Sequence, residues 1–153
     1  MFSHKLNGPG LKHELAVCIK TSLIVWINGP FRGGKHDSVI FRENLSGLLF
    51  DDEAVECDAG HGNDEKLRTP DMGERRSDRK MKADVRAQHE AVNGRLKQFN
   101  ALATHFGHMK PNKEGMMERH KTCFHAVAVI TQLKLMHGMQ IFATGLDHDV
   151  PHW

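Results

Sequence analysis

Two apolar segments near the start of the chain have the pattern of a β-hairpin. Leu15, Val17 and Ile19 occupy alternate positions within residues 14–20, and residues 23–27 form an apolar run that ends at Asn-Gly-Pro. Alternation over several residues is typical of a half-buried strand, and turn-forming residues commonly bound such strands. The sequence therefore predicts two short strands joined by a turn.

A short helix and a short strand are predicted next. Asp37 or Ser38 is a suitable N-cap for an apolar-periodic segment that runs to about residue 48 or 49. Residues 54–58 form a brief strand, and residues 59–77 contain much Gly, Asp and Lys with little periodicity. That composition predicts a long loop after the strand, and loops of such length are often functional.

The second half of the chain has the pattern of two long helices. The first covers residues 79–100, and its apolar positions recur at spacings of 3 and 4, which mark one buried face. These positions are Val85, Val92, Leu96 and Phe99, with His89 in the same seam. The second helix covers residues 115–136 and is apolar nearly all round in its second half, which predicts a buried element. The order of elements predicts a single α/β domain.

Composition narrows the class of protein. The chain has 153 residues, 39% of them hydrophobic, and a formal net charge of +2, which excludes a histone-like polycation and an acidic disordered tail. The longest apolar run, residues 123–136, is too short and too polar to span a bilayer, and no signal-peptide segment is evident. Three cysteines in such a chain favour a reducing, intracellular compartment.

Charge is unevenly distributed. Residues 1–65 have 6 basic and 10 acidic side chains, whereas residues 66–97 have 10 basic and 5 acidic side chains, a net of +5. The basic middle indicates either a strip that contacts phosphates or an ordinary solvated surface. Its densest part also resembles a nuclear-localisation patch, a motif that matches many unrelated proteins. The basic residues of that part are Arg75, Arg76, Arg79, Lys80 and Lys82.

Two motif-like patterns favour neither phosphate binding nor zinc binding. Residues 29–35 fit the spacing of a phosphate-binding loop, but His36 stands where a Ser or Thr hydroxyl would bind Mg²⁺, and Pro30 removes one N–H donor. Several His and Cys side chains are chemically suitable zinc ligands, but their spacing is not that of a zinc finger. These residues are Cys57, His61, His105, His108, His120, Cys123 and His125.

Two carboxylates are candidates for a site that binds a hard metal ion. Asp58 ends the short strand directly before Ala-Gly, and Glu90 lies in mid-helix, one position from the apolar seam. Carboxylates from a strand end and a facing helix can hold Mg²⁺ or Mn²⁺ through oxygen. Structural interpretations are also open: Asp58 could bind local backbone N–H groups in a turn, and Arg86 and Glu90 have the spacing of a surface ion pair.

Several segments occur in an order that resembles a known family. The most specific is residues 86–99, Arg-Ala-Gln-His-Glu-Ala-Val-Asn-Gly-Arg-Leu-Lys-Gln-Phe. The others are residues 3–5, 7–11, 24–31, 41–42, 57–60 and 124–133. Together they span about residues 3 to 142 and resemble the DDE superfamily endonucleases derived from Harbinger-type transposases.

The resemblance implies an α/β ribonuclease H-like domain over residues 1–142, followed by a tail at 143–153. It implies metal-dependent cleavage or transfer of DNA strands, with Asp58 and Glu90 as the second and third catalytic carboxylates. Two Mg²⁺ or Mn²⁺ ions would activate the attacking oxygen and stabilise the leaving oxygen. The basic stretch 66–97 then becomes a candidate DNA-backbone contact, and a nuclear location follows from the family.

One departure from the family pattern concerns the first catalytic Asp, which lies upstream of the segment matched by residues 3–5. Here the first carboxylate is Glu14. The expected fold therefore lacks its first, central strand, and the resulting unpaired sheet edge favours self-association. His61 is a lesser departure, because the family usually has an aromatic hydroxyl there. Two hypotheses follow: an impaired DDE-type nuclease domain, or a non-catalytic transposon remnant that binds DNA or another partner.

Overall fold

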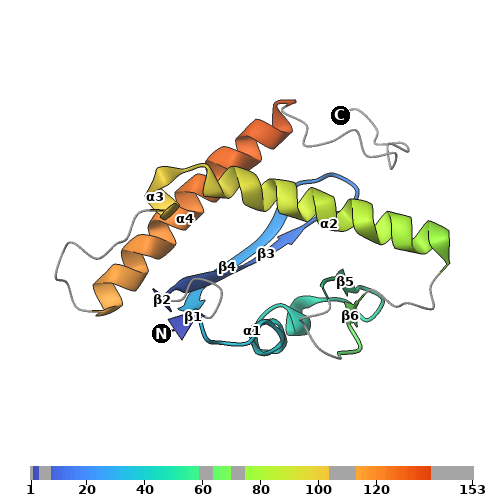
Figure 1. Cartoon of the computed structure of the whole chain (residues 1–153), viewed down its shortest axis with the longest axis horizontal. Helices are drawn as coiled ribbons and strands as arrows, with labels where there is room; N and C mark the ends of the chain where they lie inside the picture. The colour runs from blue at the N-terminus through green and yellow to red at the C-terminus, as the bar shows by residue number, and fades with distance from the viewer. Residues whose placement is uncertain (1, 4–7, 59–63, 70–74, 104–112, 139–153) are drawn as a thin grey trace. The chain divides into compact units, whose positions relative to one another are not determined.

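The computed structural model describes residues 2–3, 8–58, 64–69, 75–103 and 113–138 (Figure 1). The fold is mixed α/β, as the sequence predicted. The chain divides into two compact units, one of residues 1–14 and 28–86 and the other of residues 15–27 and 87–153. Each unit is described by itself, and the tail expected at 143–153 lies outside the described residues.

The first unit contains two small sheets. Strand β1 (Phe2–Ser3) is antiparallel to β2 (Gly8–Pro9). Strand β5 (Val55–Glu56) is parallel to β6 (Leu67–Arg68), with Val55 opposite Leu67 and Glu56 opposite Arg68. The short strand predicted over residues 54–58 is thus confirmed, but only at Val55 and Glu56. Strand β6 was missed because two residues show no measurable periodicity.

Helix α1 (Asp37–Glu43) is shorter than predicted, and a 3₁₀ turn, η1 (Ser46–Leu48), follows it. His36, not Asp37 or Ser38, is the N-cap, and the Asp37 carboxylate accepts a hydrogen bond from Lys12 Nζ at 2.9 Å. The Asn44 side chain donates to the Ile40 carbonyl at 2.7 Å. Asparagine side chains compete for backbone partners in this way, and the α-helix ends beside Asn44.

A hairpin and a long helix run through both units. Strands β3 (Leu11–Val17) and β4 (Ile24–Arg32) pair with each other, which confirms the predicted hairpin. Its turn is closed by the Cys18 N–H, which donates to the Leu23 carbonyl at 2.9 Å, and Ser22 adopts φ 59°. Helix α2 (Arg76–Lys97) confirms the first long helix, beginning and ending three residues earlier than expected.

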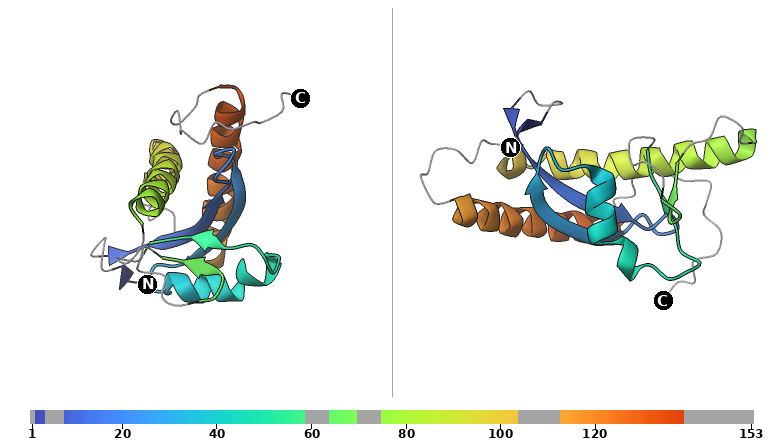
Figure 2. Two further views of the ribbon diagram at one scale, coloured as in Figure 1. Left: turned by 90° about the vertical axis from the view of Figure 1, so that its right-hand side faces the viewer. Right: turned by 90° about the horizontal axis from the view of Figure 1, so that it is seen from below.

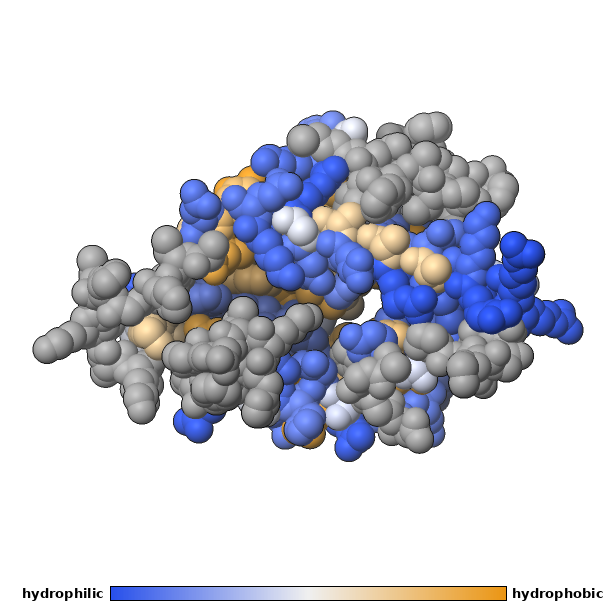
Figure 3. All heavy atoms as spheres, viewed as in Figure 1, coloured by the Kyte–Doolittle hydropathy of each residue, from blue (hydrophilic) through white to orange (hydrophobic). Residues whose placement is uncertain are grey.

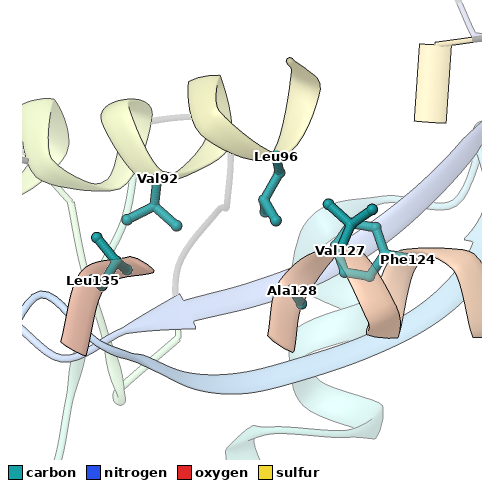
Figure 4. Packing of buried hydrophobic residues seen from close by; sticks show 6 residues of the cluster. All are labelled: Val92, Leu96, Phe124, Val127, Ala128 and Leu135. Atoms are coloured by element: carbon teal, nitrogen blue, oxygen red, sulfur yellow. The ribbon is translucent and has the colours of Figure 1, made fainter. Parts of the chain in front are cut away.

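The core of the second unit lies between α2, α4 (Lys113–Met136) and the turn end of the hairpin. Val92 and Leu96 project from α2 toward α4, as Figure 4 shows, and both are almost completely buried. The α4 side chains in this core are Phe124, Val127, Ala128 and Leu135. Hairpin residues, among them Leu15, Val17 and Ile27, pack against them. The predicted seam is thus confirmed at Val92 and Leu96, and a short helix α3 (Asn100–Ala103) follows α2.

Burial of α4 differs from the prediction. The views of Figure 2 show α4 running beside the hairpin, and its side toward the core is buried. Four large apolar side chains of its second half are nevertheless exposed: Val129, Ile130, Leu133 and Met136. The described residues supply no second layer for this face. Among the helices of the described residues, none is both long and apolar enough to cross a bilayer.

Candidate functional site

Asp58 follows the parallel β5–β6 pair in the first unit. The Val55 N–H donates to the Lys66 carbonyl at 2.8 Å, and the Cys57 N–H donates to the Arg68 carbonyl at 3.0 Å. These bonds hold the backbone up to Cys57, and Asp58 is exposed directly after it. The carboxyl ends of parallel strands form the edge at which α/β sheets commonly place ligand-binding side chains. Asp58 therefore lies two residues beyond the end of β5, not at the last position of the strand as the sequence predicted.

The charge of Asp58 affects the neighbouring thiol. Burial, together with the negative charges of Asp58 and Glu56, raises the pKa of Cys57 to about 11, against a smaller opposing effect of Lys82. Cys57 is thus fully protonated at neutral pH and reacts slowly with alkylating agents, since the thiolate is the nucleophile. For Cys18, burial alone would raise the pKa, but hydrogen bonds with Thr21 and Lys20 lower it.

Alkylation rates test this arrangement. In metal-free buffer at pH 8, we expect iodoacetamide to modify Cys18 well before Cys57, because only about 0.1% of a thiol with a pKa near 11 is ionised at that pH. Asp58→Asn removes one of the charges that raise the pKa, so it should accelerate modification of Cys57. Peptide mass spectrometry measures both rates, with the exposed Asp52→Asn as control. Equal effects of the two substitutions would contradict this account.

Glu90 lies on α2 in the second unit and is exposed, while its neighbour Gln88 is buried and His89 half-buried. His89 Nε2 lies 3.3 Å from the Leu15 carbonyl oxygen, and its Nδ1 lies 3.3 Å from Asn93 Nδ2. These contacts fix the helix face next to Glu90. Glu90 therefore borders the core without being inside it, as its position relative to the apolar seam predicted.

Asp58 and Glu90 thus belong to different units, and each is described within its own. Among the residues that the structure describes, no three His, Cys, Asp or Glu side chains are grouped so that they could hold a metal ion. Of the zinc candidates, Cys57, His120, Cys123 and His125 are described and form no such group. His61, His105 and His108 lie outside the described residues.

Four of the five candidate DNA-contacting residues gather at the start of α2. Arg75 precedes the helix, Arg76, Arg79 and Lys80 lie in its first turns, and all four are exposed. Figure 3 shows deep-blue, strongly hydrophilic residues over this end of α2. Positive side chains are unfavourable at the positive end of a helix dipole, so an anion bound here would relieve that repulsion. We call these four residues the basic cluster.

Lys82, the fifth candidate, forms an ion pair within the first unit and is not part of the basic cluster. Its Nζ donates to the Thr69 carbonyl at 3.1 Å and lies 3.7 Å from Glu56 Oε2, and both charged side chains are only 11% exposed. The ion pair joins α2 to the β5–β6 sheet within the first unit. Lys82 therefore has a structural role, and its charge is largely compensated by Glu56 and shielded from solvent.

The segment that resembles a phosphate-binding loop does not form one. Gly29, Pro30, Phe31 and Arg32 lie in strand β4 rather than in a loop. Gly29 has φ +120°, and a Cβ there would lie 2.9 Å from the Lys12 carbonyl oxygen, so strand packing explains the glycine. The Lys35 ammonium pairs with Glu43 instead of projecting toward a ligand. The motif-like spacing is therefore explained by a strand and the short connection after it.

Two glutamines that fix the turn of the hairpin were missed by the sequence analysis. Gln88 on α2 donates to the Ile19 carbonyl at 3.3 Å and to Ser22 Oγ, and Gln132 on α4 accepts from the Ile24 N–H at 2.8 Å. Gln88 is 2% exposed and lies three residues after Val85, so its place in the seam was a detectable signal. Because Gln88 is polar, a search for apolar positions did not include it in the buried seam.

No protein-family model, no curated protein and no solved structure matches this chain.

Proposed function

We propose that this chain is part of a DDE-type endonuclease domain with a ribonuclease H-like fold, in which Asp58 and Glu90 bind a divalent metal ion. The observation that carries the proposal is Asp58 itself, an exposed carboxylate at the carboxyl end of the parallel β5–β6 pair. An exposed Glu90 on a long helix further along the chain is the second support. The order of a hairpin, a helix, parallel strands and then two long helices suits that fold.

The donor chemistry suits Mg²⁺ or Mn²⁺. Both ions prefer oxygen ligands, and Mg²⁺ in particular is commonly held by one or two carboxylates, with water and substrate phosphates in the other positions. Two carboxylates are therefore enough protein ligands for a site of low affinity. The described residues contain no group of three His, Cys, Asp or Glu side chains that could hold a metal ion. When bound, such an ion would polarise the scissile phosphate and activate the attacking water or 3′-hydroxyl.

Other residues of this chain would position the two carboxylates and the DNA substrate. The backbone bonds of Val55 and Cys57 to the neighbouring strand fix the point at which the Asp58 carboxylate leaves the sheet. The contact of His89 with the Leu15 carbonyl fixes the orientation of the helix face beside Glu90. The basic cluster would contact DNA phosphates and raise the local concentration of substrate. The nuclear location and DNA as the partner belong to the same proposal.

Metal binding and strand cleavage are tested together. Because Asp58 and Glu90 supply two carboxylates to the ion, we expect weak Mn²⁺ binding and no efficient nicking of supercoiled plasmid. Asp58→Asn should weaken Mn²⁺ binding at least about tenfold, since a charged ligand is lost. The matched control is Asp84→Asn, an exposed carboxylate on α2.

Two results would contradict the assignment. One is Mn²⁺ affinity that falls equally in Asp58→Asn and Asp84→Asn, which would show only unspecific attraction to acidic residues. The other is Mg²⁺-dependent nicking that persists in Asp58→Asn, because the proposed ligand would then not be needed for the reaction.

A second candidate function is a non-catalytic DNA-binding module. The specific observation in its favour is the basic cluster, in which four exposed positive side chains gather at one helix start. Binding by such a cluster would depend on phosphates and not on a divalent ion. The two functions therefore separate by Mn²⁺ binding. Asp58→Asn should weaken it in an endonuclease domain, whereas a DNA-binding module needs no divalent ion and should be unaffected by this substitution.

A further inference from the structure

Helix α4 has two apolar stripes, and only one of them is covered. The covered stripe consists of Phe124, Val127, Ala128 and Leu135, all buried in the core of the second unit. The other stripe consists of Ala126, Val129, Leu133 and Met136, all exposed. Its spacings of 3, 4 and 3 residues are those of an apolar coiled-coil seam. We call these four residues the outer stripe; in Figure 3, hydrophobic residues (orange) reach the surface over part of α4.

The outer stripe continues into a groove beside strand β4. The groove is lined by residues 24–27 of β4 and by Ala128, Val129, Gln132 and Leu133 of α4. Val25 on its β4 side is 63% exposed, and Val129 and Leu133 on its α4 side are 57% and 49% exposed. Helix face and groove therefore form one continuous apolar surface of the second unit.

The charges around this surface favour a neutral occupant. Residues 21–31 and 122–133 contain no Asp, Glu, Lys or Arg. Lys134 is the one charged residue within the span of the outer stripe, and its ammonium group lies over the Phe99 ring. A second copy of the same surface therefore meets little like-charge repulsion, and a two-fold axis lets one patch contact itself.

The size of the surface also suits a second copy. The surface also takes in Ile130, which adjoins Val129 and Leu133 on α4. Val25, Val129, Ile130, Leu133 and Met136 are each between 43% and 63% exposed. Together they expose on the order of 500 Å² of apolar surface, which lies within the size range of interaction patches. A standard homodimer buries about 800 Å² per partner, of which roughly 65%, or about 500 Å², is apolar. The surface thus supplies the apolar share of one such interface.

We propose that this surface is the interface of a homodimer in which α4 packs antiparallel against α4 of a second copy. The two-fold axis would pass near the middle of the outer stripe, between Val129 and Leu133. An antiparallel arrangement keeps the two Lys134 ammonium groups apart, and within one copy Lys134 lies over the Phe99 ring at 5.2 Å. This dimer does not depend on metal binding. Its interface is the surface formed by the outer stripe of α4 and the groove beside β4.

Sedimentation velocity of the full chain at 1 to 100 µM tests the proposal. We expect a concentration-dependent dimer in the wild type, and Val129→Glu/Leu133→Glu should raise its dissociation constant at least about a hundredfold, because the dimer would bury four carboxylates. The control is Met81→Glu, which places one carboxylate at another exposed apolar residue and should leave the dimer unchanged. Circular dichroism checks that each variant is folded.

A second variant keeps the test decisive if the double variant unfolds. Ala126 lies in the outer stripe but does not line the groove, whereas Gln132 does. Ala126→Glu should therefore weaken the dimer and leave the hydrogen bond between the Ile24 N–H and Gln132 intact. A wild type that stays monomeric at 100 µM would overturn the proposal. The proposal would also be overturned if Met81→Glu weakened the dimer as much as Val129→Glu/Leu133→Glu does. Survival of the dimer in both Ala126→Glu and the folded double variant would overturn it as well.

Discussion

Replacement of Leu96 by alanine is expected to lower the free energy of unfolding by about 3 kcal/mol, within the range measured for buried leucines. Leu96 is 3% exposed and lies between α2 and α4 in the core of the second unit (Figure 4). Truncation removes apolar contacts and leaves a cavity among Val92, Phe124 and Val127, which lie on helices and relax only partly. For a chain of this size the midpoint of thermal unfolding should fall by roughly 10 °C.

Chemical unfolding followed by circular dichroism measures this effect. The matched control is Leu48→Ala, the same change at a side chain that is 62% exposed in η1. A surface substitution of this kind should cost less than about 0.5 kcal/mol. Equal losses in the two variants would show that Leu96 is not part of a packed core and would remove the basis for the arrangement of α2 and α4.

Reversal of the basic cluster is expected to have the largest effect on DNA binding. The variant Arg75→Glu/Arg76→Glu/Arg79→Glu/Lys80→Glu replaces four exposed positive charges at the start of α2 by negative ones. Each phosphate contact contributes about 0.9 to the slope of log affinity against log salt, so four contacts give a slope near −3.5. We expect the variant to lose at least about a hundredfold in affinity at 0.1 M salt and most of that slope.

Fluorescence anisotropy with a short duplex at 50 to 300 mM salt measures both quantities. Lys82→Gln is the first control, because Lys82 lies against Glu56 and Thr69, and its loss should leave the slope unchanged. Lys121→Glu is the second, an exposed basic residue on α4 outside the cluster. A slope that falls as much in Lys121→Glu as in the fourfold variant would show that binding follows net charge and not this cluster.

Long periodic segments were the part of the fold that the sequence predicted well. The seam through Val85, Val92 and Leu96 indicated α2, and the alternation at Leu15 and Val17 indicated the hairpin, because repeated burial on one face leaves a clear pattern. Strand β6 was not predictable in this way, since its two residues lie in a loop-like composition. The 3₁₀ turn after α1 depended on the side-chain bonds of Asn44, which no periodicity reveals.

For the candidate site, the sequence could predict the local position of single residues but not which residues contact one another. The sequence placed Asp58 at the end of a short strand, and the structure has it two residues beyond that strand. It placed Glu90 beside the apolar seam, where Glu90 is found. The different environments of Lys80 and Lys82 were not predictable, because the pairing of Lys82 with Glu56 joins residues 26 positions apart through the fold. Apolarity around α4 predicted burial but could not show that one of its faces has no cover among the described residues.

Paramagnetic broadening by Mn²⁺ tests the central claim most directly, because it asks whether Asp58 and Glu90 bind the same ion. Substoichiometric Mn²⁺ added to ¹⁵N-labelled protein should broaden the amide signals around both residues, at Cys57 in the first unit and at Glu90 in the second. Asp58→Asn should abolish the broadening at both places. Broadening confined to one of the two carboxylates, or centred on the exposed acidic residues Asp51 and Asp52, would contradict the proposed metal site.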